Sequence, residues 1–340
     1  MRFGLVLLGF LVEWPPVATR VNTLRYQDLM ETSALPTLQD QLNSLLLAPP
    51  TEVRRLFHGR GRHWPGLEHL TIDWLQGQVL VSLFKEPSAE FLLALQELLT
   101  EWVQSELWLS SGASSLLLQH RSRDGSPMEV LWGQHVEHQN VIENGLTFKL
   151  DIGRNQNNGL FLDMRCGRAW VKDNAHNKRV LNLFAYTCGF SVAAIEGGAE
   201  QVVNLDMAKA MLSRGRDNHR LNGHDLSRVS FLGHDIFKSW GKIKKYGPYD
   251  LVIIDPPSFQ KGSFALTKDY QRVLRRLPEL LSASGQVLAC VNDPTISSQF
   301  LIDGMAIEAP ELHFQQRLDN PAEFPDIDPE GGLKALIFQR

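Results

Sequence analysis

Cysteine is scarce in this chain, and metal-binding patterns are missing. The 340 residues include three cysteines, Cys166, Cys188 and Cys290, and no C-x-x-C pair. An odd, widely spaced set argues against a disulfide framework and a structural zinc site and is typical of a reducing compartment, so we expect a cytoplasmic protein. None of the eleven histidines falls in a spacing such as H-E-x-x-H, and we expect no metal.

Long apolar runs and a large net charge are also missing. The apolar stretch at residues 3–12 is too short to span a bilayer, and the residues after it lack the small-x-small pattern of a cleaved secretory signal. We expect a buried strand or helix there and no membrane contact. The net charge of −4 gives no overall attraction to a phosphate backbone, so any contact with nucleic acid depends on local basic patches.

The sequence has neither of the glycine-rich loops that hold phosphates. A dinucleotide site needs G-x-G-x-x-G after the first strand of its sheet, where this chain offers only Gly189, and no G-x-x-x-x-G-K-[ST] pattern occurs. Hydride chemistry with NAD is therefore disfavoured. A nucleoside without phosphates would relax the demand for glycine.

The patterns that are present divide the chain into four parts. We expect a helical lead-in over 1–50, a small α/β domain over 51–135, and a connector over 136–176 with a β-hairpin at Asn144-Gly145, a strong hairpin signal. From 177 to 340, short apolar runs alternate with helical segments and end in two strand-like runs. This pattern predicts an α/β fold whose larger sheet has seven strands, mainly parallel, with helices on both faces.

Acidic residues end three strands of this larger sheet, at the edge where parallel sheets bind ligands. Asp206 lies 24 residues after Asn182, where an acid can accept hydrogen bonds from both ribose hydroxyls. Asp235 can accept from an exocyclic amine such as adenine N6, with Ile236 beside the ring. Each acid alone could be a helix cap, but ribose and adenine without phosphate indicate S-adenosylmethionine.

Several stretches carry a family resemblance. "VLNLFAYTCGFSVAAIEGGAEQVVNLD", "GHDIF" and "DPPSF" resemble the motifs of class I S-adenosylmethionine-dependent methyltransferases, and more narrowly those of a bacterial family that modifies bases of large-subunit ribosomal RNA. Upstream, "RLFHGRGRHWPGLEHLTIDWLQGQVLVSLF" is similar to that family's central domain, and "QNNGLFLDMR" is similar to its motif before the catalytic domain. Residues 1–50 do not resemble the RNA-binding PUA domain that many members carry.

The resemblance implies a Rossmann-like sheet, S-adenosylmethionine as cofactor and ribosomal RNA as partner. It also implies cofactor-binding residues in and after the strand ends: Asn182, Phe184, Ala185, Tyr186, Thr187, Gly189, Asp206, Met207, Asp235 and Ile236. Asp163 and Arg165 in "FLDMRCGR" have two interpretations. They form an internal ion pair, or they bind the ammonium and carboxylate groups at the methionine end of the cofactor.

In the stretch "LVIIDPPSFQ", an apolar run that predicts a buried strand is followed directly by a carboxylate and two prolines. An isolated D-P-P favours a helix cap and a turn, but here it follows the fourth parallel strand, beside the expected cofactor. Pro256 and Pro257 have no N–H and leave carbonyls without competing donors. We expect Asp255 and these carbonyls to receive hydrogen bonds from a base and Phe259 to stack on it, so that positioning supplies most of the catalysis.

The acceptor atom depends on the residues after the fifth predicted strand, "LACVNDP". Cytosine-C5 enzymes of the family carry a catalytic cysteine there, which activates the ring. This chain has Asn292 at the position that aligns with that cysteine, and its Cys290 lies two residues earlier. A nitrogen is then the better acceptor, and guanine N7, with its in-plane lone pair, is favoured. The alternatives are a cytosine-C5 enzyme that uses Cys290 and a non-catalytic RNA-binding or assembly protein with this fold.

A basic stretch in the small domain, "RRLFHGRGRHW", suits contact with RNA. Four arginines, two histidines and a tryptophan in eleven residues are typical of a surface that contacts phosphates and stacks on bases. A solvated face is the alternative. We expect the substrate-binding residues to be Arg54, Arg55, Arg60 and Arg62, together with Asn292.

Overall fold

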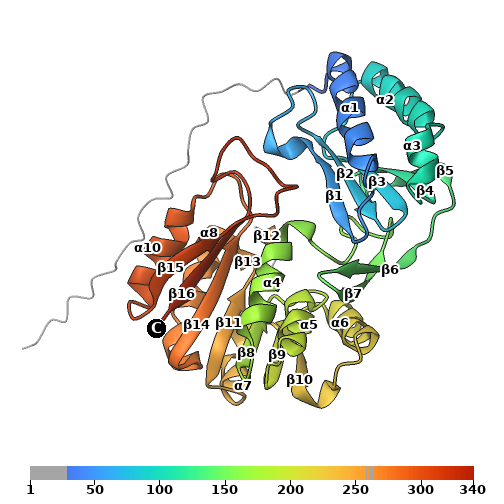
Figure 1. The fold of residues 1–340 in the computed structure, drawn as a ribbon. Helices are drawn as coiled ribbons and strands as arrows, with labels where there is room; N and C mark the ends of the chain where they lie inside the picture. The colour runs from blue at the N-terminus through green and yellow to red at the C-terminus, as the bar shows by residue number, and fades with distance from the viewer. Residues whose placement is uncertain (1–28, 258, 261–263) are drawn as a thin grey trace, which may run out of the picture.

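The computed structural model describes residues 29–257, 259–260 and 264–340. The N-terminal apolar stretch, for which we expected a strand or helix, lies outside these residues. Figure 1 shows two α/β units, with the hairpin of β6 (His138–Glu143) and β7 (Leu146–Asp151) between them. No helix among the described residues is long and apolar enough to cross a membrane.

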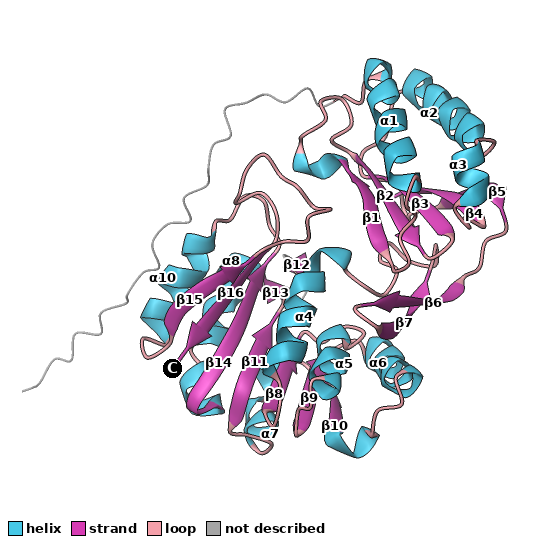
Figure 2. Cartoon of the chain, viewed as in Figure 1, coloured by secondary structure: helices cyan, strands magenta, loops and turns pink. Residues whose placement is uncertain are grey.

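The smaller unit is a five-stranded sheet with three helices (Figure 2). Its strand order is β1-β2-β3-β4-β5, in which β3 and β4 are parallel and the other neighbours are antiparallel. The elements are η1 (Thr32–Ala34), α1 (Leu35–Leu46), β1 (Arg54–His58), η2 (Gly59–Gly61), β2 (Leu70–Leu75), β3 (Gln78–Leu83), α2 (Ala89–Trp102), α3 (Glu106–Ser110), β4 (Ser115–His120) and β5 (Met128–Gly133). Helix α2 begins where the Ser88 hydroxyl accepts the Phe91 N–H at 3.1 Å, and it buries Phe91 and Leu95 one turn apart.

Helix α1 shares the core of the smaller unit. Leu38 and Leu42 are fully buried and belong to the same cluster as Leu56 of β1 and Ile72 of β2. One continuous core therefore crosses the expected division between the lead-in and the small domain. The four-part division of the chain stays a prediction, and within it we place α1 with the small domain.

The hairpin expected at Asn144-Gly145 is present. Strands β6 and β7 pair antiparallel, and the two turn residues have left-handed backbones with φ of 51° and 76°. Further along, within the predicted connector, the chain forms η3 (Leu162–Met164) and α4 (Arg165–Asn174). Helix α4 buries Val171 in one cluster with α5 (Gly189–Glu196) and the larger sheet.

The larger unit is a seven-stranded, mainly parallel sheet, so this prediction is confirmed. The order is β10-β9-β8-β11-β14-β16-β15; the first five strands are parallel, and β16 is antiparallel to both neighbours. Its elements are β8 (Arg179–Leu183), β9 (Gln201–Asp206), α6 (Lys209–Leu221), η4 (Leu226–Arg228), β10 (Val229–Gly233), η5 (Ile236–Lys238), α7 (Trp240–Lys244), β11 (Tyr249–Ile254), β12 (Phe259–Gln260), β13 (Phe264–Ala265), α8 (Leu266–Leu274), α9 (Leu277–Leu280), β14 (Leu281–Val291), α10 (Ser298–Glu308), β15 (His313–Leu318) and β16 (Lys334–Gln339). The order reverses between β8 and β11, the kind of switch point where such sheets bind ligands.

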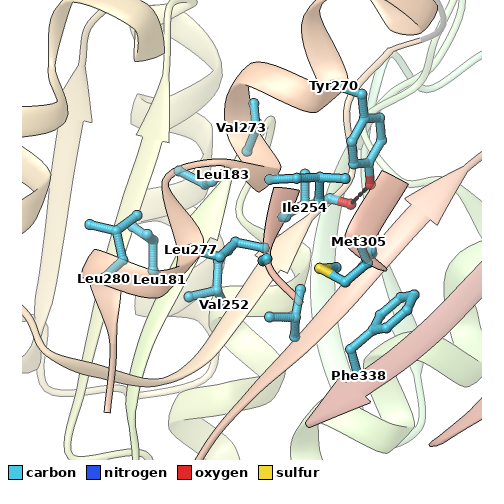
Figure 3. Close-up of a cluster of buried hydrophobic side chains, with 14 of the residues drawn as sticks. Leu181, Leu183, Val252, Ile254, Tyr270, Val273, Leu277, Leu280, Met305 and Phe338 are labelled. Carbon is cyan, nitrogen blue, oxygen red and sulfur yellow. Dashed lines mark hydrogen bonds between the residues drawn. The ribbon is translucent and has the colours of Figure 1, made fainter. Parts of the chain in front are cut away.

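Strand β11 is apolar at successive positions because helices cover both faces of the sheet (Figure 2). Val252 and Ile254 belong to the cluster formed with α8, α9 and α10 (Figure 3). Leu251 and Ile253 belong to the opposite cluster, with α4 and α5. The buried run 251–254 therefore leads directly to the polar edge of the sheet.

Candidate active site

A cavity of about 540 Å³ lies at the carboxyl ends of the parallel strands. Fourteen of the predicted site residues line it: Asp163, Phe184, Ala185, Tyr186, Thr187, Gly189, Asp206, Met207, Asp235, Ile236, Asp255, Pro256, Pro257 and Asn292. The wall also contains Phe161 and Arg168, which the sequence analysis did not identify. Asn182 and Arg165 are absent from the lining.

The loop between β8 and α5 has a strained backbone that its neighbours hold in place. Phe184, Tyr186 and Cys188 have φ of 58°, 47° and 62°, a left-handed region that costs non-glycine residues about 1–3 kcal/mol each. The hydroxyl of Thr187 donates to the carbonyl of Gly159 at 2.6 Å and anchors the loop to the connector. The loop is thereby pre-shaped before any ligand binds.

Asp206 holds the same loop from the end of β9. Its Oδ2 accepts the backbone N–H of Tyr186, and its Oδ1 accepts that of Ala208, both at 2.8 Å. A carboxylate has about four acceptor sites, so two remain for ribose hydroxyls. The next side chain, Met207, is apolar yet 46% exposed, which suits it to cover a planar ring.

Asp235 follows β10 and caps η5. Its Oδ1 accepts the N–H of Phe237 at 2.9 Å, which is the capping role that many strand-end aspartates have. Capping uses Oδ1, and Oδ2 lies 3.7 Å from Nζ of the exposed Lys238, so Oδ2 keeps acceptor sites for an amine. The buried Ile236 beside it lines the cavity, and capping and adenine binding are compatible.

Asp255 lies at the end of β11, with Pro256 and Pro257 next to it in the cavity wall. Burial raises the pKa of Asp255 from 3.8 to about 7, the charge of Asp163 adds to this shift, and Arg168 opposes it. Near neutral pH the group is therefore divided between its acid and carboxylate forms. Phe259 is in β12, but its side chain lies outside the described part of the chain, and its stacking role stays a prediction.

Asp163 and Asn292 meet across the cavity, although they are 129 residues apart. The side-chain amide of Asn292 donates to Oδ2 of Asp163 at 2.9 Å. Burial raises the pKa of Asp163, against the lowering effects of Arg55, Arg168 and this hydrogen bond. The connector and the end of β14 thus form one polar wall.

Arg168 occupies the place in the cavity where we expected Arg165. Arg165 instead pairs with Glu323, with 3.1 Å between Nη1 and Oε1. Arg168, nearly one turn further along α4, makes a bidentate pair with the buried Glu143 at 2.6 and 2.8 Å and donates to the carbonyl of Phe161. Arg165 and Arg168 are three residues apart, so on a helix they lie on nearly the same face. This spacing points to Arg168 only when the segment is known to form helix α4.

Asn182 supports the site from beneath the cavity. Its side-chain amide donates to Oδ1 of Asn204 at 2.9 Å. Asn204 donates to the Ser191 hydroxyl at 2.9 Å, which in turn lies 2.9 Å from Nε2 of His219. All four side chains are buried, and the network joins β8, β9, α5 and α6 under the loop.

Three of the four arginines predicted to contact RNA form ion pairs within the molecule. The pairs are Arg54–Glu323 at 3.1 Å, Arg62–Asp326 at 2.6 Å and Arg55–Asp73 at 2.6 Å. The first two connect the smaller unit to the segment before β16. Arg60 differs, because it is exposed and its guanidinium stacks on the ring of Phe84.

Cys290 is poorly placed to act as a nucleophile. It is fully buried in a cluster with Leu288 and Ile337 and is not among the described residues that line the cavity. Burial raises the pKa of its thiol well above the ordinary range. The Tyr270 hydroxyl lies 3.1 Å from the carbonyl oxygen of Cys290 and 3.3 Å from that of Ile254, and it joins the ends of β14 and β11. Figure 3 shows the hydrogen bond to Ile254.

Comparison with known proteins identifies the family. The family model of S-adenosylmethionine-dependent methyltransferases matches residues 54–339. The chain belongs to this family. A solved methyltransferase-fold relative, SMU.776 in complex with SAH, has a TM-score of 0.77 at 24% identity and covers 91% of this chain and 80% of its own. That likeness shows the fold.

Two curated relatives extend the comparison. Ribosomal RNA large subunit methyltransferase I of Aeromonas salmonicida is 33% identical over 232 residues, which are 66% of this chain and 57% of that protein. YwbD of Bacillus subtilis is 29% identical over 320 residues, which are 87% of this chain and 76% of YwbD. The chain thus spans little more than half the length of the Aeromonas protein.

S-adenosylmethionine is the cofactor of this methyltransferase family, and the cavity fits it. The molecule carries a sulfonium, an ammonium and a carboxylate, and the cavity wall offers four aspartates and the guanidinium of Arg168. The apolar side chains of Met207 and Ile236 suit its adenine. Within the described residues, no group of three or more His, Cys, Asp or Glu side chains could hold a metal ion.

Proposed function

We propose that this methyltransferase acts on a base of RNA, in large-subunit ribosomal RNA, and that guanine N7 receives the methyl group. The observation that carries the proposal is the polar wall of Asn292 and Asp255, in which the hydrogen bond from Asn292 to Asp163 joins the base side of the cavity to the residues expected to hold the cofactor. The name of the Aeromonas relative, a ribosomal RNA large subunit methyltransferase, supports RNA as the substrate.

Each part of the cavity has a role in this reaction. When bound, S-adenosylmethionine supplies an electrophilic methyl group on a sulfonium. Asp206 accepts the ribose hydroxyls, Asp235 accepts the adenine amine, and Arg168 and Asp163 bind the carboxylate and ammonium groups. Because the β8–α5 loop is already held by Asp206 and Thr187, little ordering is required on binding.

The residues at the ends of β11 and β14 orient the base. Pro256 and Pro257 have no backbone N–H, so these two residues present carbonyl acceptors without donors that compete for them. Asp255 offers a further acceptor beside them. Guanine N7 presents an in-plane lone pair, so no residue has to remove a proton during transfer. Methylation at N7 places a positive charge on the ring, and the carboxylate form of Asp255 stabilises that charge.

The test is transfer of labelled methyl to an unmodified transcript of large-subunit ribosomal RNA, followed by mass spectrometry of the nucleosides. We expect 7-methylguanosine. A product of 5-methylcytidine would contradict the proposed acceptor atom. Absence of transfer to this transcript and to assembled ribosomal particles would favour the non-catalytic alternative.

Replacement of Cys290 separates the nitrogen acceptor from the cytosine alternative. Cys290→Ala is expected to keep most of the methyl-transfer rate, because the buried thiol is not part of the described cavity lining, while the small void lowers stability by about 1 kcal/mol. Steady-state rates and thermal unfolding measure the two effects. Cys166→Ala, at a half-buried cysteine of α4, is the matched control. Complete loss of activity in a folded Cys290→Ala protein, with Cys166→Ala active, would restore the cysteine mechanism.

A further inference from the structure

The smaller unit carries two arginines that share one aromatic ring. The guanidinium carbons of Arg60 and Arg121 lie 4.3 and 4.7 Å from the ring centroid of Phe84. Over the described ranges, neither guanidinium forms an ion pair with a carboxylate, and Nε of Arg121 is buried without a hydrogen-bond partner. Two adjacent cations without a carboxylate partner favour an anion from outside the chain.

The electrostatic surroundings increase this preference. The positive charge of Arg55 repels the guanidinium of Arg60. Burial, then repulsion by Arg60, lowers the pKa of Arg121 to about 10. Asp73, the acid of the smaller unit whose charge acts on Arg121, is already paired with Arg55 at 2.6 Å. A bound anion would relieve the repulsion among the three cations.

The arginine pair lies beside the cavity. Nη2 of Arg121 donates to Oδ1 of Asn157 at 3.0 Å, and Asn157 lines the cavity. The charge of Asp163, which is bonded to Asn292, also acts on Arg60. The pair is therefore close to the wall that we assign to the base.

We propose that Arg60 and Arg121, stacked on Phe84, bind a backbone phosphate of the RNA next to the nucleotide whose base enters the cavity. A guanidinium offers a planar fork of donors that matches two phosphate oxygens. Stacking on Phe84 limits the rotation of both forks, so less side-chain entropy is lost on binding. This inference rests on the proposed function, and it assigns phosphate contact to Arg121 in place of the internally paired Arg54 and Arg62.

Four variants test the phosphate site: Arg60→Ala, Arg121→Ala, the double variant, and Arg123→Ala as the control. Arg123 is two residues from Arg121, but it is exposed and already pairs with Glu86 at 2.6 Å. Each site substitution is expected to weaken RNA binding roughly tenfold and to reduce the slope of log K against log salt by about 0.7–1. KM for RNA should rise with little change in kcat, and the affinity for S-adenosylmethionine should stay the same.

The outcomes separate this proposal from the proposed function. If the wild-type protein methylates RNA and the double variant has the affinity and salt dependence of Arg123→Ala, the phosphate site is wrong and the function stands. If the wild-type protein neither binds nor methylates RNA, the function fails and the phosphate site fails with it. Because Arg60 is exposed, Arg60→Ala should stay folded, and thermal unfolding of each variant checks this.

Discussion

Asp206→Ala is expected to weaken the binding of S-adenosylmethionine by about 100-fold or more, because two hydrogen bonds to a charged acceptor contribute about 1.5–3 kcal/mol each. The substitution removes the ribose acceptor and also leaves the N–H groups of Tyr186 and Ala208 without their partner. The left-handed residues of the loop can then relax away from the shape that the ligand requires. Isothermal titration calorimetry with the cofactor and with its demethylated product measures the effect.

Asp225→Ala is the matched control. Asp225 is also an aspartate close to a strand of the larger sheet, and it accepts the N–H of Ser227 at 2.9 Å as the cap of η4. It does not line the cavity, so its loss should leave the cofactor affinity unchanged. An Asp206→Ala protein that binds the cofactor within threefold of wild type would show that Asp206 is neither the ribose acceptor nor needed to hold the loop in its binding shape.

The strand-end residues could be predicted from the sequence because their signals are local. A buried parallel strand must end where its apolar run ends, and parallel strands bring their carboxyl ends to one edge. Asp206, Asp235 and Asp255 each follow such a run, and all three line one cavity in the structure. No distant contact had to be known in advance.

The arginines could not be assigned in the same way, because their partners are far away in the sequence. Arg62 pairs with Asp326, 264 residues later, and no spacing within "RRLFHGRGRHW" reports that contact. Arg121 stands outside this stretch, and only the fold brings it to Arg60 on the ring of Phe84. The amino-acid composition of "RRLFHGRGRHW" identified it as a basic segment. The ion pairs that its arginines form in the folded protein determine which of these charges remain available to a ligand.

Asp255→Ala is expected to reduce kcat by about 100-fold or more, since a positioned group near the reacting atoms can contribute that much. The cofactor should still bind with nearly wild-type affinity, because Asp206 and the β8–α5 loop are unchanged. Single-turnover methyl transfer at saturating cofactor measures the rate. The control is Asp250→Asn: Asp250 is on the same strand but bonds to the N–H of Arg179 and the hydroxyl of Ser282 outside the cavity lining.

The pH dependence of Asp255→Asn distinguishes a catalytic role from a structural one. Since the folded pKa is about 7, kcat/KM of the wild-type protein should rise with pH up to about 7 and then level off, whereas Asp255→Asn should lack this rise. Because the pKa of Asp255 is raised in the folded state, ionisation of this group destabilises the folded protein. The contribution of protonated Asp255 to the free energy of unfolding is therefore complete below pH 3.8 and is lost as the pH rises past 7. Asp255→Asn should therefore be more resistant to thermal unfolding than wild type at pH 8 while being far less active. A variant that loses activity and stability together would contradict this role.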